Sequence, residues 1–305
     1  MLLAIAMLLM AQLSPDWIAR AAGHIREKRF DAAIQELSQA ARQEPRSSLV
    51  HLLLGQAYLS KGTAAFVAQA KAEFQEARDL DDTQVLASFY IAKIDLDLGR
   101  IRQAERELER ALEKKPGEHF LLALLGETRR QQGDPDGAIQ LTTQAIESTA
   151  EALPVHYYRA LAWWDRKNEK RALEDLAKIL PTAAATADAY LLAGAIHLDR
   201  QRLREAEANV RQAIEMEDGR AEAHLRLAQV LRRQRRFDLA RRELARVEAA
   251  PKLTSPYFQR LLADAACEQG LILLDEGNAG AARAWFVRAL EIDPEHAEAR
   301  RRLKP

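Results

Sequence analysis

Hydrophobic residues along the chain recur three or four positions apart in short blocks, and the blocks come in pairs. In one such pair Phe89 and Leu96 belong to the first block and Ile101 to the second, with Gly99 in the turn between them and Pro116 at the end. Residues three or four apart lie on one face of a helix, whereas glycine and proline commonly end helices. The pattern therefore predicts a helical hairpin of about 34 residues.

The hairpin pattern repeats along most of the chain. The spacings are 34, 37, 34, 34, 34, 34 and 42 residues between units that begin at Ser14, Ser48, Val85, His119, Leu153, Ala187, Ala221 and Ala263. Position eight is always small: Ala21, Gly55, Ala92, Gly126, Ala160, Gly194, Ala228 and Gly270. Position twenty, allowing for three inserted residues in the second unit, is always alanine: Ala33, Ala70, Ala104, Ala138, Ala172, Ala206, Ala240 and Ala282.

Antiparallel helices approach closely only where neither carries a bulky side chain at the crossing, which explains the small residues. We therefore expect an all-α solenoid of about eight helix-turn-helix hairpins over residues 14–296. Residues 297–305 start a further helix that breaks off, and their arginines are typical of a solvating C-terminal cap.

The repeated positions resemble the signature of the tetratricopeptide repeat family. Besides the small residues at positions eight and twenty, seven of the eight units carry Leu, Phe or Val at position twenty-four. Most units carry alanine at position twenty-seven, and some carry proline at thirty-two. Trp17 and Tyr58 stand at the family's positions four and eleven. The resemblance covers about residues 14–296. It implies a right-handed superhelix whose first helices line a concave groove that holds peptides, helices or other proteins.

In that family the groove is lined chiefly by positions two, five, nine, twelve and thirteen. The resemblance places there Gln56, Phe89, Lys93, Glu127, Arg130, Tyr157, Leu161, Trp164, Gln229, Arg232 and Arg233, with Leu191, Ala195 and Leu198 from the sixth unit. This is not the Lys/Asn-rich set with which some members clamp a terminal carboxylate. An aromatic and aliphatic stripe flanked by Arg and Gln favours an apolar segment or helix of a partner protein. The alternative is that Tyr157, Leu161 and Trp164 only pack against their neighbours.

Catalytic and cofactor signatures are missing from the sequence. It contains no HExxH, CxxC, GxSxG or glycine-rich phosphate loop. Five of the seven histidines fall at framework positions four and eleven (His51, His156, His224, His24 and His197), and His119 and His296 lie at unit junctions. The single cysteine, Cys267, cannot form an internal disulfide. We expect a protein that is not an enzyme and needs no cofactor or metal.

The charges give little support to nucleic-acid binding. Lysine and arginine number 45 and so do aspartate and glutamate, so no net positive charge attracts a polyanion. The run RRQRRFDLARREL, from Arg232 to Leu244, keeps binding of RNA or another polyanion open as an alternative. Since Arg235 and Arg236 fall in a predicted turn and only Phe237 could stack on a base, a solvated surface is favoured.

Residues 1–13, MLLAIAMLLMAQL, form an apolar segment too short to span a bilayer. The segment is typical of an export signal ending near Ala11, although no Lys or Arg precedes it. We expect export to the periplasm, with a buried N-terminal segment of a cytoplasmic protein as the alternative. Export makes an accessory subunit of an envelope or secretion assembly a further candidate role.

Two irregularities interrupt the period. In KGTAAFVAQA the insertion is expected to start the second helix early, at Thr63, and to push Phe66 and Val67 out at the rim. Structural filling is favoured for these two residues, with a contact site as the alternative. In APKLTSPYFQRLL, eight extra residues are expected to start the next helix near Pro256. Tyr257, Phe258, Leu261 and Leu262 would then cover the seventh hairpin, or else form a hydrophobic ledge.

Overall fold

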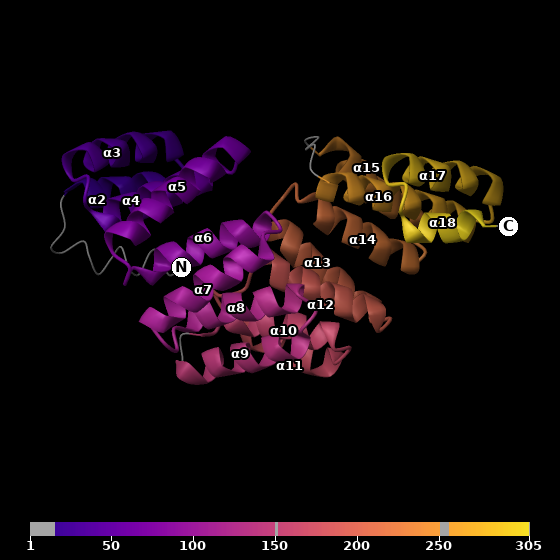
Figure 1. Ribbon diagram of the computed structural model, residues 1–305. Helices are drawn as coiled ribbons and strands as arrows, with labels where there is room; N and C mark the ends of the chain where they lie inside the picture. The colour runs from indigo at the N-terminus through magenta and orange to yellow at the C-terminus, as the bar shows by residue number, and fades with distance from the viewer. Residues whose placement is uncertain (1–15, 150–151, 251–255, 305) are drawn as a thin grey trace. The chain divides into compact units, whose positions relative to one another are not determined.

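Helices make up all the regular structure in the computed structural model, which describes residues 16–149, 152–250 and 256–304. Within these ranges there is no strand, and the predicted all-α solenoid is confirmed. The predictions on residues 1–13 and on the start of the second irregularity, residues 251–255, lie outside the described residues. The helices in Figure 1 are α2 Asp16–Arg26, α3 Phe30–Gln43, α4 Ser48–Lys61, α5 Ala64–Leu80, α6 Val85–Asp97, α7 Ile101–Lys114, α8 His119–Gln131, α9 Pro135–Ser148, α10 Val155–Asp165, α11 Glu169–Ile179, α12 Ala187–Asp199, α13 Leu203–Met216, α14 Ala221–Arg233, α15 Phe237–Ala249, α16 Pro256–Asp275, α17 Ala279–Ile292 and α18 Ala297–Leu303.

The turn inside each hairpin contains one residue in the left-handed region, always at position fifteen. Its φ lies between 57° and 85° at Lys28, Gly62, Gly99, Gly133, Lys167, Gln201, Arg235 and Gly277. Glycine adopts this conformation without a steric penalty, whereas a Cβ atom is strained there. Half of the turns therefore use the residue that the geometry favours, and half hold a larger side chain against that preference.

The two helices of a hairpin touch where position eight meets position twenty-four. A Cβ atom built on Gly270 would lie 2.6 Å from the ring of Phe286, and one on Gly194 would lie 2.6 Å from Val210. Gly55 and Gly126 are equally tight against Phe74 and Thr142. In the other four units alanine at position eight is matched by leucine at position twenty-four: Ala21 and Leu37, Ala92 and Leu108, Ala160 and Leu176, Ala228 and Leu244. Glycine thus accompanies aromatic or β-branched partners, and alanine accompanies leucine.

The chain divides after Asp175 into two compact units, each with its own buried cores. In the first unit, Trp17, Leu37, Phe74 and Leu108 are among the core residues. The insertion lengthens α5, which begins at Ala64, one residue after the predicted start, and Phe66 stacks on Tyr58 with ring centroids 5.9 Å apart. This stacking agrees with the expected filling role.

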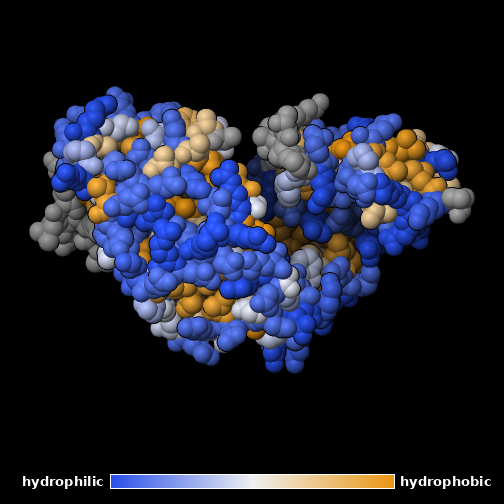
Figure 2. All heavy atoms as spheres, viewed as in Figure 1, coloured by the Kyte–Doolittle hydropathy of each residue, from blue (hydrophilic) through white to orange (hydrophobic). Residues whose placement is uncertain are grey.

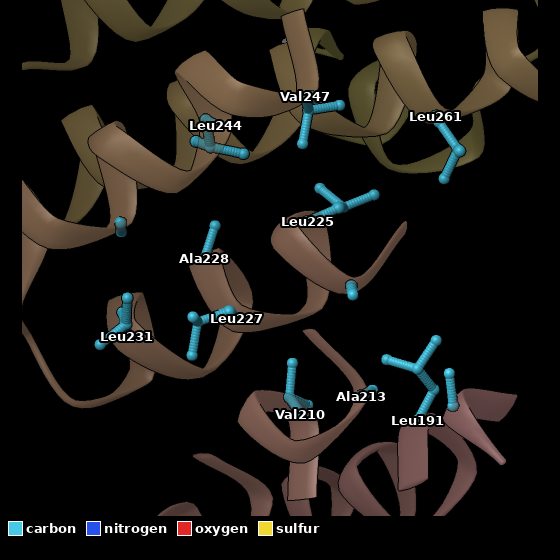
Figure 3. Close-up of a cluster of buried hydrophobic side chains, with 14 of the residues drawn as sticks. Leu191, Val210, Ala213, Leu225, Leu227, Ala228, Leu231, Leu244, Val247 and Leu261 are labelled. Carbon is cyan, nitrogen blue, oxygen red and sulfur yellow. The ribbon is translucent and has the colours of Figure 1, made fainter. Parts of the chain in front are cut away.

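In the second unit the largest buried cluster joins α12 to α16, and Figure 3 shows Leu191, Leu225 and Leu261 within it. Helix α16 begins at Pro256, as predicted. Phe258 and Leu261 are buried in this cluster and Leu262 packs against it, so the early start of α16 covers the seventh hairpin. Tyr257 departs from that expectation, because it is 59% exposed.

The outer surface is mostly polar. In the view of Figure 2 hydrophilic residues dominate, and hydrophobic ones form several separate patches, one of them over α17, which carries the exposed Val287. The C-terminal helix α18 packs on α17 and pairs Arg301 and Arg302 with Glu298. Among the described helices, none combines the length and the apolar composition that crossing a membrane requires.

Candidate functional site

In the first unit, a row of half-buried side chains follows one face of α10. Tyr157, Leu161 and Trp164 stand at i, i+4 and i+7, so they lie on one side of the helix. All three keep part of their surface exposed. Tyr157 meets Tyr158 edge to face, with ring centroids 5.5 Å apart. The three side chains are therefore partly buried against their neighbours and partly exposed to solvent.

Phe89 extends the aromatic surface on α6. It meets Tyr90 and Phe120 edge to face, with centroid distances of 5.4 and 5.5 Å, and is itself half-buried. Lys93, one turn further along α6, is exposed and lies 3.9 Å from Asp97. Gln56 differs from its predicted place at the groove surface, because it is only 6% exposed and packs inside the unit.

Arg130 connects neighbouring first helices. Its guanidinium donates to both carboxylate oxygens of Glu127, at 2.7 and 2.8 Å, and to Asp165 of α10 at 2.8 Å. The hydrogen bond to Glu127 is the main cause that raises the pKa of Arg130, against the effect of its partial burial. The two predicted groove residues thus satisfy each other's charge, and Asp165 adds a second acceptor.

In the second unit, the first helices enclose a cleft of about 580 Å³. Gln229, Arg232 and Arg233, all predicted from the sequence, lie together in its lining. Arg232 donates to the buried carboxylate of Glu268 and, at 2.8 Å, to Asp275. Both acceptors lie on α16, so this ion pair joins α14 to α16.

The sixth-unit residues predicted for the groove contribute little surface. Leu191, Ala195 and Leu198 are 5%, 5% and 7% exposed. The lining of the cleft is instead largely charged, with several residues from α16 and α18 that sequence reasoning did not select. Of these three predicted apolar residues, only Leu198 reaches the lining of the cleft.

A repeated pair of positions in the sequence predicts some of the ion pairs that the sequence analysis did not identify. Arg130 and Arg232 both stand at position twelve of their units, and their partners Asp165 and Asp275 both stand at position thirteen of the following unit. Both pairs lie 2.8 Å apart. An arginine at position twelve followed by an aspartate one unit later therefore indicates an ion pair between successive first helices.

The histidines at position four occupy a recurring polar contact inside the hairpins. A ring nitrogen of His51, His156 and His224 lies 2.7, 2.6 and 2.7 Å from Glu73, Asp175 and Glu243, respectively. The third unit uses the same two positions, where the Ser88 hydroxyl donates to Glu107 at 2.7 Å. We call these four contacts the hairpin clips. Their place between the two helices of one hairpin supports the framework role that the sequence predicted for these histidines.

The arginine run is partly neutralised by acidic neighbours. Arg236 donates to Glu207 at 2.9 Å, Arg241 pairs with Glu276, and Arg232 is held as described above. Among the described residues, no group of three or more His, Cys, Asp and Glu side chains could hold a metal ion.

Stacked helical hairpins with small residues at their crossings define a helical-repeat protein. Family models described as tetratricopeptide repeat match residues 19–85, 89–152 and 123–190 with one model, 197–265 with a second and 263–296 with a third. The chain belongs to the tetratricopeptide repeat family. No curated protein matches the sequence significantly.

Solved structures of repeat proteins resemble the fold at low sequence identity. A chain of the APC/C hetero-tetramer Cut9–Hcn1 has a TM-score of 0.72 at 15% identity, over 97% of this chain and 57% of that one. IFIT1, solved as a monomeric mutant with Gppp-AAAA, also gives 0.72 at 15% identity, over 94% and 70% of the two chains. PilF of Pseudomonas aeruginosa gives 0.57 at 15% identity, over 72% and 96%. This chain thus spans little more than half the length of the Cut9–Hcn1 chain, and the likeness concerns the fold alone.

Proposed function

We propose that this protein is a non-catalytic scaffold that binds a peptide or helix of a partner protein along the first helices of its hairpins. Family and fold already support a role in protein interaction. The observation that carries the finer proposal is the row of Tyr157, Leu161 and Trp164, half-exposed on one face of α10. Large, partly buried aromatic side chains are the typical anchors of protein interfaces, because they bury much apolar area at a low cost in conformational entropy.

The surroundings of this row favour an apolar ligand. Phe89 is held by Tyr90 and Phe120, so it offers a fixed aromatic edge. Three of the five N–H donors of Arg130 are taken by Glu127 and Asp165, so this arginine has less hydrogen-bonding capacity left for a ligand. An amphipathic helix that buries its apolar side against such a surface needs few polar contacts.

Other roles have less support. The carboxylates that neutralise Arg232, Arg236 and Arg241 weaken the case for RNA or another polyanion. The hairpin clips account for His51, His156 and His224 without catalysis. Export to the periplasm, with a role in an envelope or secretion assembly, rests on residues 1–13 and stays part of the proposal.

The test is affinity capture from native extract with the full chain and matched variants, with bound proteins and nucleic acids both identified. Tyr157→Ala/Trp164→Ala removes the anchors on α10. Leu98→Ala/Met216→Ala is the control, since these two apolar side chains are 52% and 50% exposed and belong to the ends of α6 and α13 instead of to α10. Circular dichroism confirms that each variant keeps its helices.

We expect protein partners that are retained by the control and lost by the α10 variant. Partners retained by both variants would move the binding surface elsewhere. Capture of RNA that disappears between low and moderate salt would replace the proposal with the polyanion alternative.

A further inference from the structure

The charges inside the cleft of the second unit are mostly paired with one another. Glu268 and Asp275 hold Arg232, and Asp264 lies 3.0 Å from Nε2 of His296. On α18, Glu298 holds Arg301 and Arg302. Only Asp199, among the acidic side chains that line the cleft, has no partner in the described part of the chain.

Two arginines on the walls of the cleft, and one in the smaller pocket beside it, have no part in this pairing. Arg226 and Arg233 lie on α14 and Arg260 lies in the first turns of α16, and within residues 16–149, 152–250 and 256–304 none of them forms an ion pair with a carboxylate. The charge of Arg233 still acts on Glu268, where it opposes the burial that raises the pKa of that carboxyl.

Other arginines of the unit, such as Arg204 and Arg242, also lie at the surface without an ion pair to a described residue, but they do not line the cleft. Arg220, for comparison, forms ion pairs with Asp188, Glu217 and Glu222. Arg232, Arg236 and Arg241 also form ion pairs, as described above.

Arg226, Arg233 and Arg260 are arranged along one continuous surface. Arg226 and Arg233 are seven residues apart on α14, so they lie on one face about 10 Å apart. A smaller pocket of about 250 Å³ beside the exposed Tyr257 contains Arg260 and Glu222, and it shares Arg226, Gln229 and Asp264 with the cleft. Apolar surface lies between the charges, contributed by Leu271 and other leucines of the lining.

We propose that this cleft binds an acidic peptide segment of a partner protein, with two or more carboxylates spaced about 10 Å apart facing Arg226, Arg233 and Arg260. The inference rests on the proposed function in that it names a partner class for the first helices, but it uses α14 and α16 instead of α10. A guanidinium binds a carboxylate through two parallel hydrogen bonds, and the leucines of the lining offer apolar contacts to the side chains between the carboxylates.

A peptide fits this cleft better than RNA does. The carboxylates of Asp199, Asp264 and Asp275 face the same space, and they would repel a continuous row of phosphates. Carboxylates on a peptide can be spaced to meet the arginines and avoid these acids. Tyr257 is the one Phe, Tyr or Trp in the described lining, so successive bases would find few stacking platforms.

The experiment measures fluorescence anisotropy with the full chain and three labelled probes. The first probe is a Glu/Leu peptide of about 12 residues with its glutamates about 10 Å apart in extended form. The second replaces every Glu by Gln, and the third is a single-stranded RNA of the same length. The cleft variant is Arg226→Gln/Arg233→Gln, and the control is Arg204→Gln/Arg242→Gln, two exposed arginines on α13 and α15 with the same change in charge.

We expect the Glu/Leu peptide to bind about tenfold or more tightly than the Gln peptide, and to lose at least about tenfold in affinity in the cleft variant alone. Equal binding of the two peptides, no binding up to millimolar concentration, equal losses in both variants, or tighter binding of the RNA would each overturn the proposal. Tyr157→Ala/Trp164→Ala should leave this binding unchanged, which separates a failure here from a failure of the α10 surface.

Discussion

Residue size at position eight is matched to the side chain at position twenty-four in each hairpin. This predicts that substitutions of Gly270 and Phe286 have non-additive effects on the free energy of unfolding. An alanine Cβ at position 270 would lie 2.6 Å from one ring carbon of Phe286 and 2.9 Å from two others. The ring is 2% exposed and enclosed by its cluster, so it cannot turn away freely. Overpacking of this kind typically costs about 1–3 kcal/mol, whereas Gly→Ala in a helix contributes about 1 kcal/mol of stability.

We therefore expect Gly270→Ala to lower the free energy of unfolding by about 1 kcal/mol net. Phe286→Leu should also destabilise, by about 1–2 kcal/mol, because it removes buried apolar volume. The double variant recreates the alanine and leucine combination of four other hairpins, such as Ala228 with Leu244. It should be more stable than the sum of the single changes predicts, by about 1–2 kcal/mol.

Urea unfolding followed by circular dichroism gives the three free energies of the cycle. Since repeat proteins can unfold in parts, Trp285 fluorescence provides a second probe, because it is the single tryptophan between residues 176 and 305. Gly280→Ala is the control, since nothing lies within 4 Å of its Cβ position, and it should stabilise. Additivity within about 0.3 kcal/mol, or a Gly270→Ala that stabilises as much as the control, would refute the packing rule.

Three further outcomes follow from other features. Lys167→Gly should raise the free energy of unfolding by about 0.5–1 kcal/mol in urea titrations, since its φ is 58°, and Gly133→Ala, at φ 85°, should lower it. Burial alone would raise the pKa of Asp175, but hydrogen bonds from His156 and a neighbouring arginine outweigh it and hold that pKa below the ordinary value of an aspartate. The resulting stability is present above about pH 4 and lost as the pH falls through the folded pKa, so the advantage of the native chain over Asp175→Asn should shrink on acidification. Burial raises the pKa of Cys267 to about 12, so a thiol reagent at pH 8 should react with it only after urea unfolding.

The sequence was most informative about what happens inside one hairpin. Small residues at position eight, alanine at position twenty and the turn at position fifteen are local requirements, and they recur in every unit. The predicted starts of α4, α6, α8, α12 and α14 coincide with the observed ones. One departure from the repeat period was also predicted correctly, because α16 begins at Pro256, as expected from a proline at the first helical position.

The surface of the second unit was harder to predict because it depends on register between hairpins. Helix α16 begins seven residues before the regular unit start, so counting positions from Ala263 leaves out Arg260 and Tyr257. Gln56 shows that a groove position in the repeat does not by itself make a side chain accessible. Its position is a groove position, yet its burial depends on how closely the neighbouring helices pack, and a position number does not contain that information.

The hairpin clips and the ion pairs between first helices differ in how they would respond to gain or loss of a repeat. Both partners of a clip lie in one hairpin, 19 residues apart for His156 and Asp175, so duplication or deletion of whole units would leave the clips intact. The partners of Arg232 are 36 and 43 residues away, in the next unit. The chain could therefore gain or lose whole units during evolution and still fold. Gain or loss of a unit at the cleft, however, would create or remove the ion pairs and the charged side chains that a ligand would contact.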